Sequence, residues 1–147
     1  MPTPSSTVYW SDLRTNPSLT ILKKLDRLLR AAGMETLNLT DKYTAFKIHF
    51  GEPGNMAYIR PPYVAVVSAL VRELGGKPFL TDANTLYSGR RHNAWDHLRS
   101  GFENGFSRDA TGCDLIIAAG LKGNDYVEMP VRGGIHCTTA KIGCAVA

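Results

Sequence analysis

The spacing of apolar residues alternates along this chain between the period of a β-strand and the period of a helix. Between residues 43 and 50, apolar side chains recur at every second position, at Phe46, Ile48 and Phe50. Between residues 63 and 74 they recur every three or four positions, and residues 113–119 form the short apolar run that a buried strand contains. Strands and helices in alternation predict an α/β fold with a mainly parallel sheet, right-handed crossovers and helices on both faces, in three layers.

Turn residues and helix caps set the bounds of the predicted elements. Strands are expected at residues 7–10, 43–50, 78–82 and 113–119. Helices are expected after Asn16-Pro17, after Pro62 and from about Asn93, and they should end at Gly33, Gly75 and Gly105. The faces expected to be buried are Ile21, Leu25, Leu28, Leu29 and Ala32 in the first helix, Tyr63, Val67, Leu70, Val71 and Leu74 in the second, and Ala94, Trp95, Leu98 and Phe102 in the third. From residue 125 the pattern changes to that of an antiparallel hairpin appended to the sheet, with strands at 126–131 and 135–142 joined across Gly133-Gly134.

Length and composition restrict the class of protein. The chain has 147 residues, 44% of them hydrophobic, so residues 1–147 are expected to form a single domain. Its net charge of +4 gives a weak preference for anionic partners, but the basic residues are scattered and no nucleic-acid-binding motif accompanies them. We therefore expect no nucleic acid as a partner. No apolar run approaches the ~20 residues of a membrane span, and residues 1–7 lack the order of a signal peptide, so we expect no membrane association and a cytoplasmic location.

The three cysteines do not form a metal-binding pattern. Cys113, Cys137 and Cys144 include no C-x-x-C pair, which argues against a zinc or iron-sulfur framework. Each is interpreted as a small, reduced, buried hydrophobe. The sequence therefore predicts no metal and no cofactor bound by this chain itself.

Two polar loops follow predicted strands, the first after Phe50 and the second after Asp82. In open α/β sheets, ligands bind beyond the carboxyl ends of the strands, so these loops are where a site is expected. The candidate ligand-binding residues are Lys47, His49, Gly51, Gly54, Asn55, Arg60, Asp82, Asn84, Thr85, Arg90 and Arg91. The common nucleotide-binding and hydrolase fingerprints are missing, so no catalytic residue is assigned.

Arginines before two predicted helices suggest an anion site. Arg60 precedes the second helix, and Arg90 and Arg91 precede the third. A cation at the positive end of a helix is unfavourable unless an anion lies between them. We therefore expect a phosphate or carboxylate between these helix starts, with Lys47 and His49 beneath it and the backbone of the glycine loop close by. An arginine that is solvated, or paired with Glu52 or Asp82, fits the sequence equally well.

The histidines and the aspartate have alternative interpretations. His49 can be a base, a ligand or a hydrogen-bonded core residue, and the core role is favoured. Asp82 can bind a metal, act as a base, or cap its loop through the backbone of the next residues. His92 and His97 have poor spacing for metal ligands and are expected at the surface.

Two longer runs form a known signature. One is residues 47–55 (KIHFGEPGN) continued by residues 58–62 (YIRPP), and the other is residues 81–87 (TDANTLY) with Gly89, Arg91, Asn93-Ala94 and His97-Leu98. From about Val8 to its end, the chain resembles the "domain of unknown function 362" family, often named uncharacterised iron-sulfur centre proteins.

The resemblance implies a redox setting and a longer protein. Family members are usually more than twice this length and carry ferredoxin-like C-x-x-C-x-x-C motifs toward the carboxyl end, which bind 4Fe-4S clusters. This chain has no such motif, so it is expected to be the N-terminal part of a longer protein, with a ferredoxin-like C-terminal portion or a redox partner. The family's activity is unsettled, and no catalytic residue can be carried over from it.

Three functions follow from these observations. The first is the redox-associated N-terminal domain of an iron-sulfur protein, with an anion-binding site. The second is a self-contained α/β enzyme or binding domain for phosphorylated or carboxylated small molecules. The third is an interaction domain with an exposed apolar surface, which would favour a homodimer.

Overall fold

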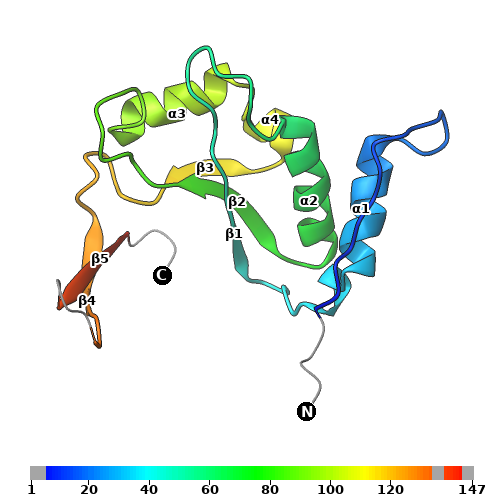
Figure 1. Cartoon of the computed structure of the whole chain (residues 1–147), viewed down its shortest axis with the longest axis horizontal. Coiled ribbons are helices and arrows are strands. Elements are labelled where there is room, and N and C mark those ends of the chain that lie inside the picture. Colours follow the sequence, from blue (N-terminus) through cyan, green and yellow to red (C-terminus); the bar gives the residue numbers. More distant parts are fainter. Residues whose placement is uncertain (1–5, 134–137, 144–147) are drawn as a thin grey trace.

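The computed structural model describes residues 6–133 and 138–143 of the chain (Figure 1). The α/β class and the order of the main elements from residue 43 onward agree with the prediction. The single turn α4 was not indicated by the sequence. The elements are α1 (Ile21–Ala31), a 3-10 turn (Met34–Thr36), β1 (Tyr43–Lys47), α2 (Pro61–Glu73), β2 (Lys77–Asp82), α3 (Ala94–Glu103), α4 (Arg108–Thr111), β3 (Asp114–Ile117), β4 (Tyr126–Pro130) and β5 (Thr139–Gly143).

The main sheet is parallel, and its strands follow the chain in the order β1-β2-β3. Its register aligns Phe46 with Leu80 and Leu80 with Leu115, so these side chains share one face. The same apolar cluster contains Val64 of α2 and Ala94 of α3. Both helices therefore cover the same face, as two right-handed crossovers running in one direction require.

The other face of this sheet carries exposed residues. Tyr43 is 80% exposed and Ile116 is 45% exposed. The predicted three-layer arrangement is therefore not confirmed in the described part of the chain. The reason is topological, because helices are placed on a second face only where the strand order reverses, and the order β1-β2-β3 has no reversal.

The start of the chain differs from the prediction in two places. Helix α1 begins at Ile21, with Thr20 as its N-cap, and not after Asn16-Pro17. The Asn16 carboxamide oxygen instead accepts the backbone N–H groups of Ser18 at 3.0 Å and Leu19 at 2.9 Å, which makes a turn before the helix. Residues 7–10, predicted as a strand, form no strand in the structure.

Helix α3 follows its predicted face only in part, because Ala94 is buried and Leu98 packs against the core as expected, but the two aromatic residues do not. Trp95 and Phe102 are 67% and 54% exposed, whereas Ala94, His97 and Gly101 are buried. A β-carbon at position 101 would lie 2.9 Å from the Leu115 side chain, so the helix approaches the sheet closely at that point. Only a residue without a side chain fits at position 101, and Trp95 and Phe102 point outward.

Helix α2 follows its predicted face only in part. Leu70 and Val71 are buried as expected, and Val64 is buried in addition. Tyr63 and Val67 are only half-buried. They line an apolar groove beside α1.

The predicted hairpin is present as the antiparallel pair β4-β5, with Val127 opposite Ile142. It forms a separate two-stranded sheet and does not extend the main sheet, so the expectation that it is appended to that sheet was wrong. The predicted turn at Gly133-Gly134 and the first residues of its second strand fall partly outside the described residues. Figure 1 shows the hairpin standing to one side of the main sheet.

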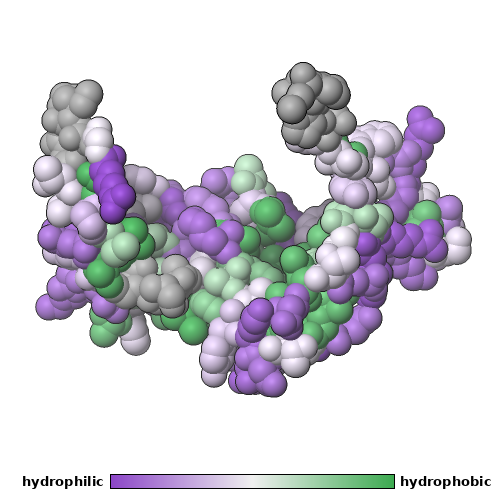
Figure 2. All heavy atoms as spheres, turned by 90° about the horizontal axis from the view of Figure 1, so that it is seen from below, coloured by the Kyte–Doolittle hydropathy of each residue, from purple (hydrophilic) through white to green (hydrophobic). Residues whose placement is uncertain are grey.

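Apolar residues remain exposed on several parts of the surface. Figure 2 shows them across the middle of the face seen from below, with more polar residues toward both ends. The large exposed apolar side chains include Trp10, Ile59, Leu86, Leu121 and Met129. Among the described residues, no helix has the length and apolar character needed to cross a membrane.

The core makes a testable contrast between two phenylalanines of similar sequence context. Phe106 is fully buried against Phe50 and Tyr58, with ring centroids 5.5 and 5.8 Å apart. We expect Phe106→Ala to lower the free energy of unfolding by about 3–5 kcal/mol, because it leaves a cavity. Phe102→Ala, on the exposed side of α3, should change it by about 0.5 kcal/mol or less. Urea unfolding followed by circular dichroism measures both, and equal losses would contradict the assigned face of α3.

Candidate functional site

The last residues of β1 and β2 lie together at the carboxyl edge of the sheet. Lys47 ends β1 and Asp82 ends β2, and parallel strands end at the same edge. The Lys47 ammonium group lies 2.7 Å from a carboxylate oxygen of Asp82. The Asp82 side chain is only 6% exposed, whereas that of Lys47 is 70% exposed. The pair therefore has a buried anion and a solvent-facing cation.

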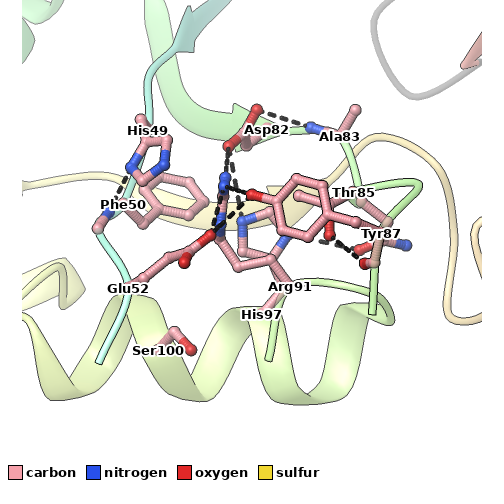
Figure 3. Close-up of polar contacts among 12 residues, drawn as sticks. His49, Phe50, Glu52, Asp82, Ala83, Thr85, Tyr87, Arg91, His97 and Ser100 are labelled. Carbon is pink, nitrogen blue, oxygen red and sulfur yellow. Dashed lines mark hydrogen bonds and ion pairs between the residues drawn. The ribbon is translucent and has the colours of Figure 1, made fainter. Parts of the chain in front are cut away.

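Arg91 joins the loops that follow the two strands (Figure 3). Its guanidinium lies 3.4 Å from Asp82 and 2.7 Å from Glu52, and it donates a hydrogen bond of 2.7 Å to the Tyr87 hydroxyl. The Tyr87 hydroxyl in turn donates to Glu52 at 2.9 Å. The Arg91 side chain is only 8% exposed. A buried arginine shared by two carboxylates fixes the geometry of both loops.

His97 lies beneath the cluster, on the buried face of α3. Its Nε2 atom is 3.6 Å from Asp82 Oδ2, and its Nδ1 atom is 3.4 Å from the Asn84 side-chain oxygen. The Asn84 amide donates to the Gly120 carbonyl at 3.1 Å, which ties the end of β2 to the segment after β3. Nε2 makes no hydrogen bond within the described part of the chain. His97 is fully buried next to Asp82 and Asn84, so its ring is not open to solvent.

The groups around Asp82 and Glu52 keep both of these carboxylates ionised. Burial alone would raise the pKa of Asp82, but His97, Lys47 and the Ala83 N–H group together lower it from 3.8 to about 2. Arg91 and Tyr87 likewise hold the pKa of Glu52 below its usual range. A carboxylate with such a low pKa is a weak base, so Asp82 is suited to holding cations and not to abstracting protons.

The glycine loop after β1 places His49 at the surface. The His49 side chain is exposed, and its Nδ1 atom accepts the Gly51 N–H group at 2.9 Å. The favoured core role of His49 was therefore wrong. Gly51 has a φ of +83°, and a β-carbon there would lie 2.6 Å from the Tyr58 and Asn104 side chains, so glycine is required.

The remaining candidates of this loop shape its backbone. Gly54 has a φ of +78° and open space around it. Asn55 accepts the Ala57 N–H group at 2.8 Å through its side chain, which closes a turn. Neither Gly54 nor the Asn55 side chain contacts Asp82 among the described interactions.

The structure brings only part of the candidate set together. Arg90 forms a two-pronged ion pair with Glu103, at 2.6 and 2.8 Å, and Arg60 lies over the Tyr58 ring with its guanidinium carbon 4.7 Å from the centroid. Neither side chain contacts Lys47 or Asp82 among the described interactions. Thr85 closes its own loop, donating its N–H to the Arg91 carbonyl at 2.8 Å.

Three residues of the cluster were absent from the candidate set. Glu52 and Tyr87 were recognised as loop residues but not as site residues, and His97 was expected at the surface. The signal for His97 was its helical spacing from Ala94 and Gly101, three residues after one and four before the other. Trp95 and Phe102 lie on the neighbouring stripe of the helix, and their greater apolar character favoured that stripe as the buried one.

The described residues do not offer ligands for an iron-sulfur cluster. Clusters are held by several cysteine thiolates, and Cys113 is buried in the apolar core, where burial raises the pKa of its thiol. Cys137 and Cys144 lie outside the described residues. Within residues 6–133 and 138–143, no three His, Cys, Asp or Glu side chains converge as metal ligands would.

Fold and site together define a parallel α/β domain with a charged cluster at its strand ends. Residues 44–147 match the family described as a domain of unknown function, DUF362, and the chain belongs to that family. The matched range contains both sequence runs on which the resemblance was based. No curated protein and no solved structure matches the chain.

The low pKa of Asp82 predicts a pH-dependent contribution to stability. The folded-state pKa of about 2 lies below the ordinary value of 3.8, so the ionised carboxylate stabilises the fold above pH 4. This contribution, about 2 kcal/mol, is lost as the pH falls from 4 toward 2. We expect Asp82→Asn to be less stable than the parent protein at pH 6 and the difference to narrow with acid. Urea unfolding between pH 6 and pH 3 measures the difference.

The control for this comparison is Asp109→Asn, which removes an exposed carboxylate from α4. It produces the same change in net charge without touching the cluster. A stability difference for Asp82→Asn that stays constant over this pH range would contradict the assigned role of the carboxylate.

Proposed function

We propose that this chain is an anion-binding domain of a redox-associated iron-sulfur protein, with Lys47 as the residue that first contacts the ligand. The ligand is a small phosphorylated or carboxylated molecule. The observation that carries the proposal is the contrast within the Lys47–Asp82 pair, between an ammonium group open to solvent and a carboxylate buried beneath it.

The chemistry of Lys47 supports this role. An ammonium group has three N–H donors, and Lys47 uses one of them on Asp82 among the described residues. Because the Lys47 side chain is largely exposed, the other donors are accessible to a ligand. The ion pair with Asp82 holds the lysine in one place, so less side-chain freedom is lost when a ligand binds.

The surroundings of Lys47 leave room for a small anion. His49 is exposed two residues further along the same strand end, and the loop that follows leaves open space at Gly54. Arg91 is neutralised by Glu52 and Asp82, so it positions the loops and does not compete for the ligand. Binding at a single accessible cation should be weak and sensitive to salt.

The redox part of the proposal rests on the sequence resemblance to iron-sulfur centre proteins. In this proposal the cluster belongs to a ferredoxin-like portion or a separate redox partner in the cytoplasm, and the domain binds an anionic molecule for it. The low pKa of Asp82 argues against the second function, a self-contained enzyme, in the form in which Asp82 is a catalytic base.

Binding at Lys47 is testable by NMR. Titration with inorganic phosphate and with acetate should shift the backbone amide resonances of residues 47–60. In Lys47→Ala these shifts should need about tenfold more ligand, since a hydrogen bond to a charged group is lost. Lys77→Ala is the matched control, because Lys77 begins β2 at the opposite end of the sheet and is also exposed and ion-paired. Unmoved resonances at residues 47–60, or equal effects of the two variants, would refute the anion site.

The redox setting needs a separate measurement. The protein encoded by the natural gene, purified without oxygen, should contain iron and acid-labile sulfide, either alone or together with a partner that co-purifies with it. An optical spectrum checks for the cluster. A colourless, iron-free preparation with no iron-containing partner would refute the redox setting and leave the anion site to its own test.

A further inference from the structure

An apolar groove lies on the other side of β1 from Lys47. It has a volume of about 510 Å³ and runs between α1, β1 and the first two turns of α2. Its walls include Leu25 of α1, Phe46 of β1, Ile48 directly after β1, and Tyr63 and Val67 of α2. Arg60 lies at the start of α2. None of its lining residues belongs to the strand-end cluster.

The size and lining of the groove fit a small apolar ligand. Small-molecule sites usually measure roughly 300–1,000 Å³ and are lined mainly by apolar side chains with a few polar groups. Here the wall residues named above are half-buried, so they present apolar surface to solvent in the absence of a ligand. A hydrocarbon chain placed against them would remove that surface from water.

Arg60 gives the groove a positive charge. Arg60 is the N-cap residue of α2, and its side chain makes no capping hydrogen bond. Its contact in the described structure is with the face of the Tyr58 ring, at 4.7 Å, and it has no carboxylate partner among the described residues. Arg30, Arg90 and Arg91, by contrast, each hold a carboxylate at 2.6–2.7 Å. A cation at the positive end of a helix is unfavourable, and an anion between the two relieves this.

We propose that this groove binds an amphipathic molecule with a hydrocarbon chain and an anionic carboxylate or phosphate head group. The head group pairs with Arg60 at the start of α2. The chain lies between Leu25, Phe46 and Val67. The binding is non-covalent and independent of the ligand site proposed at Lys47.

Three probes with the same twelve-carbon chain test the proposal: dodecanoate, dodecyl phosphate and dodecyltrimethylammonium. Isothermal titration calorimetry on the full chain, at concentrations below micelle formation, measures their binding. We expect one or both anionic probes to bind in a 1:1 ratio and the cationic probe to bind at least tenfold more weakly. The stronger of the two anions identifies the head group.

Two kinds of variant locate the binding. Arg60→Met keeps an unbranched side chain of similar length but removes the charge, and it should weaken the anionic probes about tenfold. Arg99→Met is the matched control, because it removes an exposed arginine on α3, and it should change nothing. Val67→Trp fills the groove and should abolish binding. If that variant does not fold, as judged by circular dichroism, Leu25→Trp fills the groove from the opposite wall.

The outcomes that overturn the proposal are distinct. Equal binding of the anionic and cationic probes would mean non-specific adsorption to apolar surface. Equal affinity in Arg60→Met and the parent protein would exclude the head-group contact. No binding of any probe would mean that the groove takes no such ligand in solution. None of these results bears on the phosphate titration at Lys47.

Discussion

The ionised carboxylate of Asp82 is the interaction on which the strand ends of this domain depend. It contacts side chains from three separate segments: Lys47 at the end of β1, Arg91 in the loop before α3, and His97 within α3. Burial of a carboxylate is costly, and only these partners make the charged form stable, as the lowered pKa of Asp82 indicates. Without the carboxylate, the buried guanidinium of Arg91 would retain Glu52 alone as an anionic partner among the described residues. Asp82 and Arg91 together thus fix the two polar loops.

The close packing of α3 makes this arrangement possible. Gly101 lets the helix approach Leu115 and Phe50, and the approach places His97 against the edge of the Phe50 ring, with centroids 5.6 Å apart. A bulkier residue at position 101 would push the helix away from the sheet. His97 would then move away from Asp82. Packing in the core and charge at the strand ends are therefore coupled, and the loops gain a fixed geometry from buried residues.

The sequence was informative where a simple geometric rule applied. The period of residues 43–50 and the rule that parallel strands end at one edge were enough to expect Lys47 and Asp82 in the same place. The rules failed where several elements compete for one space. Trp95 and Phe102 are more apolar than His97, yet they point outward, because the narrow gap between α3 and the sheet accepts only small side chains and one imidazole ring. The second helical layer was expected from alternation alone, which does not specify the strand order.

The alternation of side chains along β1 also explains how one strand supports two different surfaces. Lys47 points to one side of the strand, and its neighbours Phe46 and Ile48 point to the other. The first side has a charged group held by Asp82, and the second has the apolar groove next to Arg60. The strand order places β1 at the edge of the sheet. The charged group and the apolar groove on its two sides are therefore both accessible to solvent. The two candidate ligands share an anionic group but differ in their apolar part, so the face of β1 that each one contacts decides which of them binds.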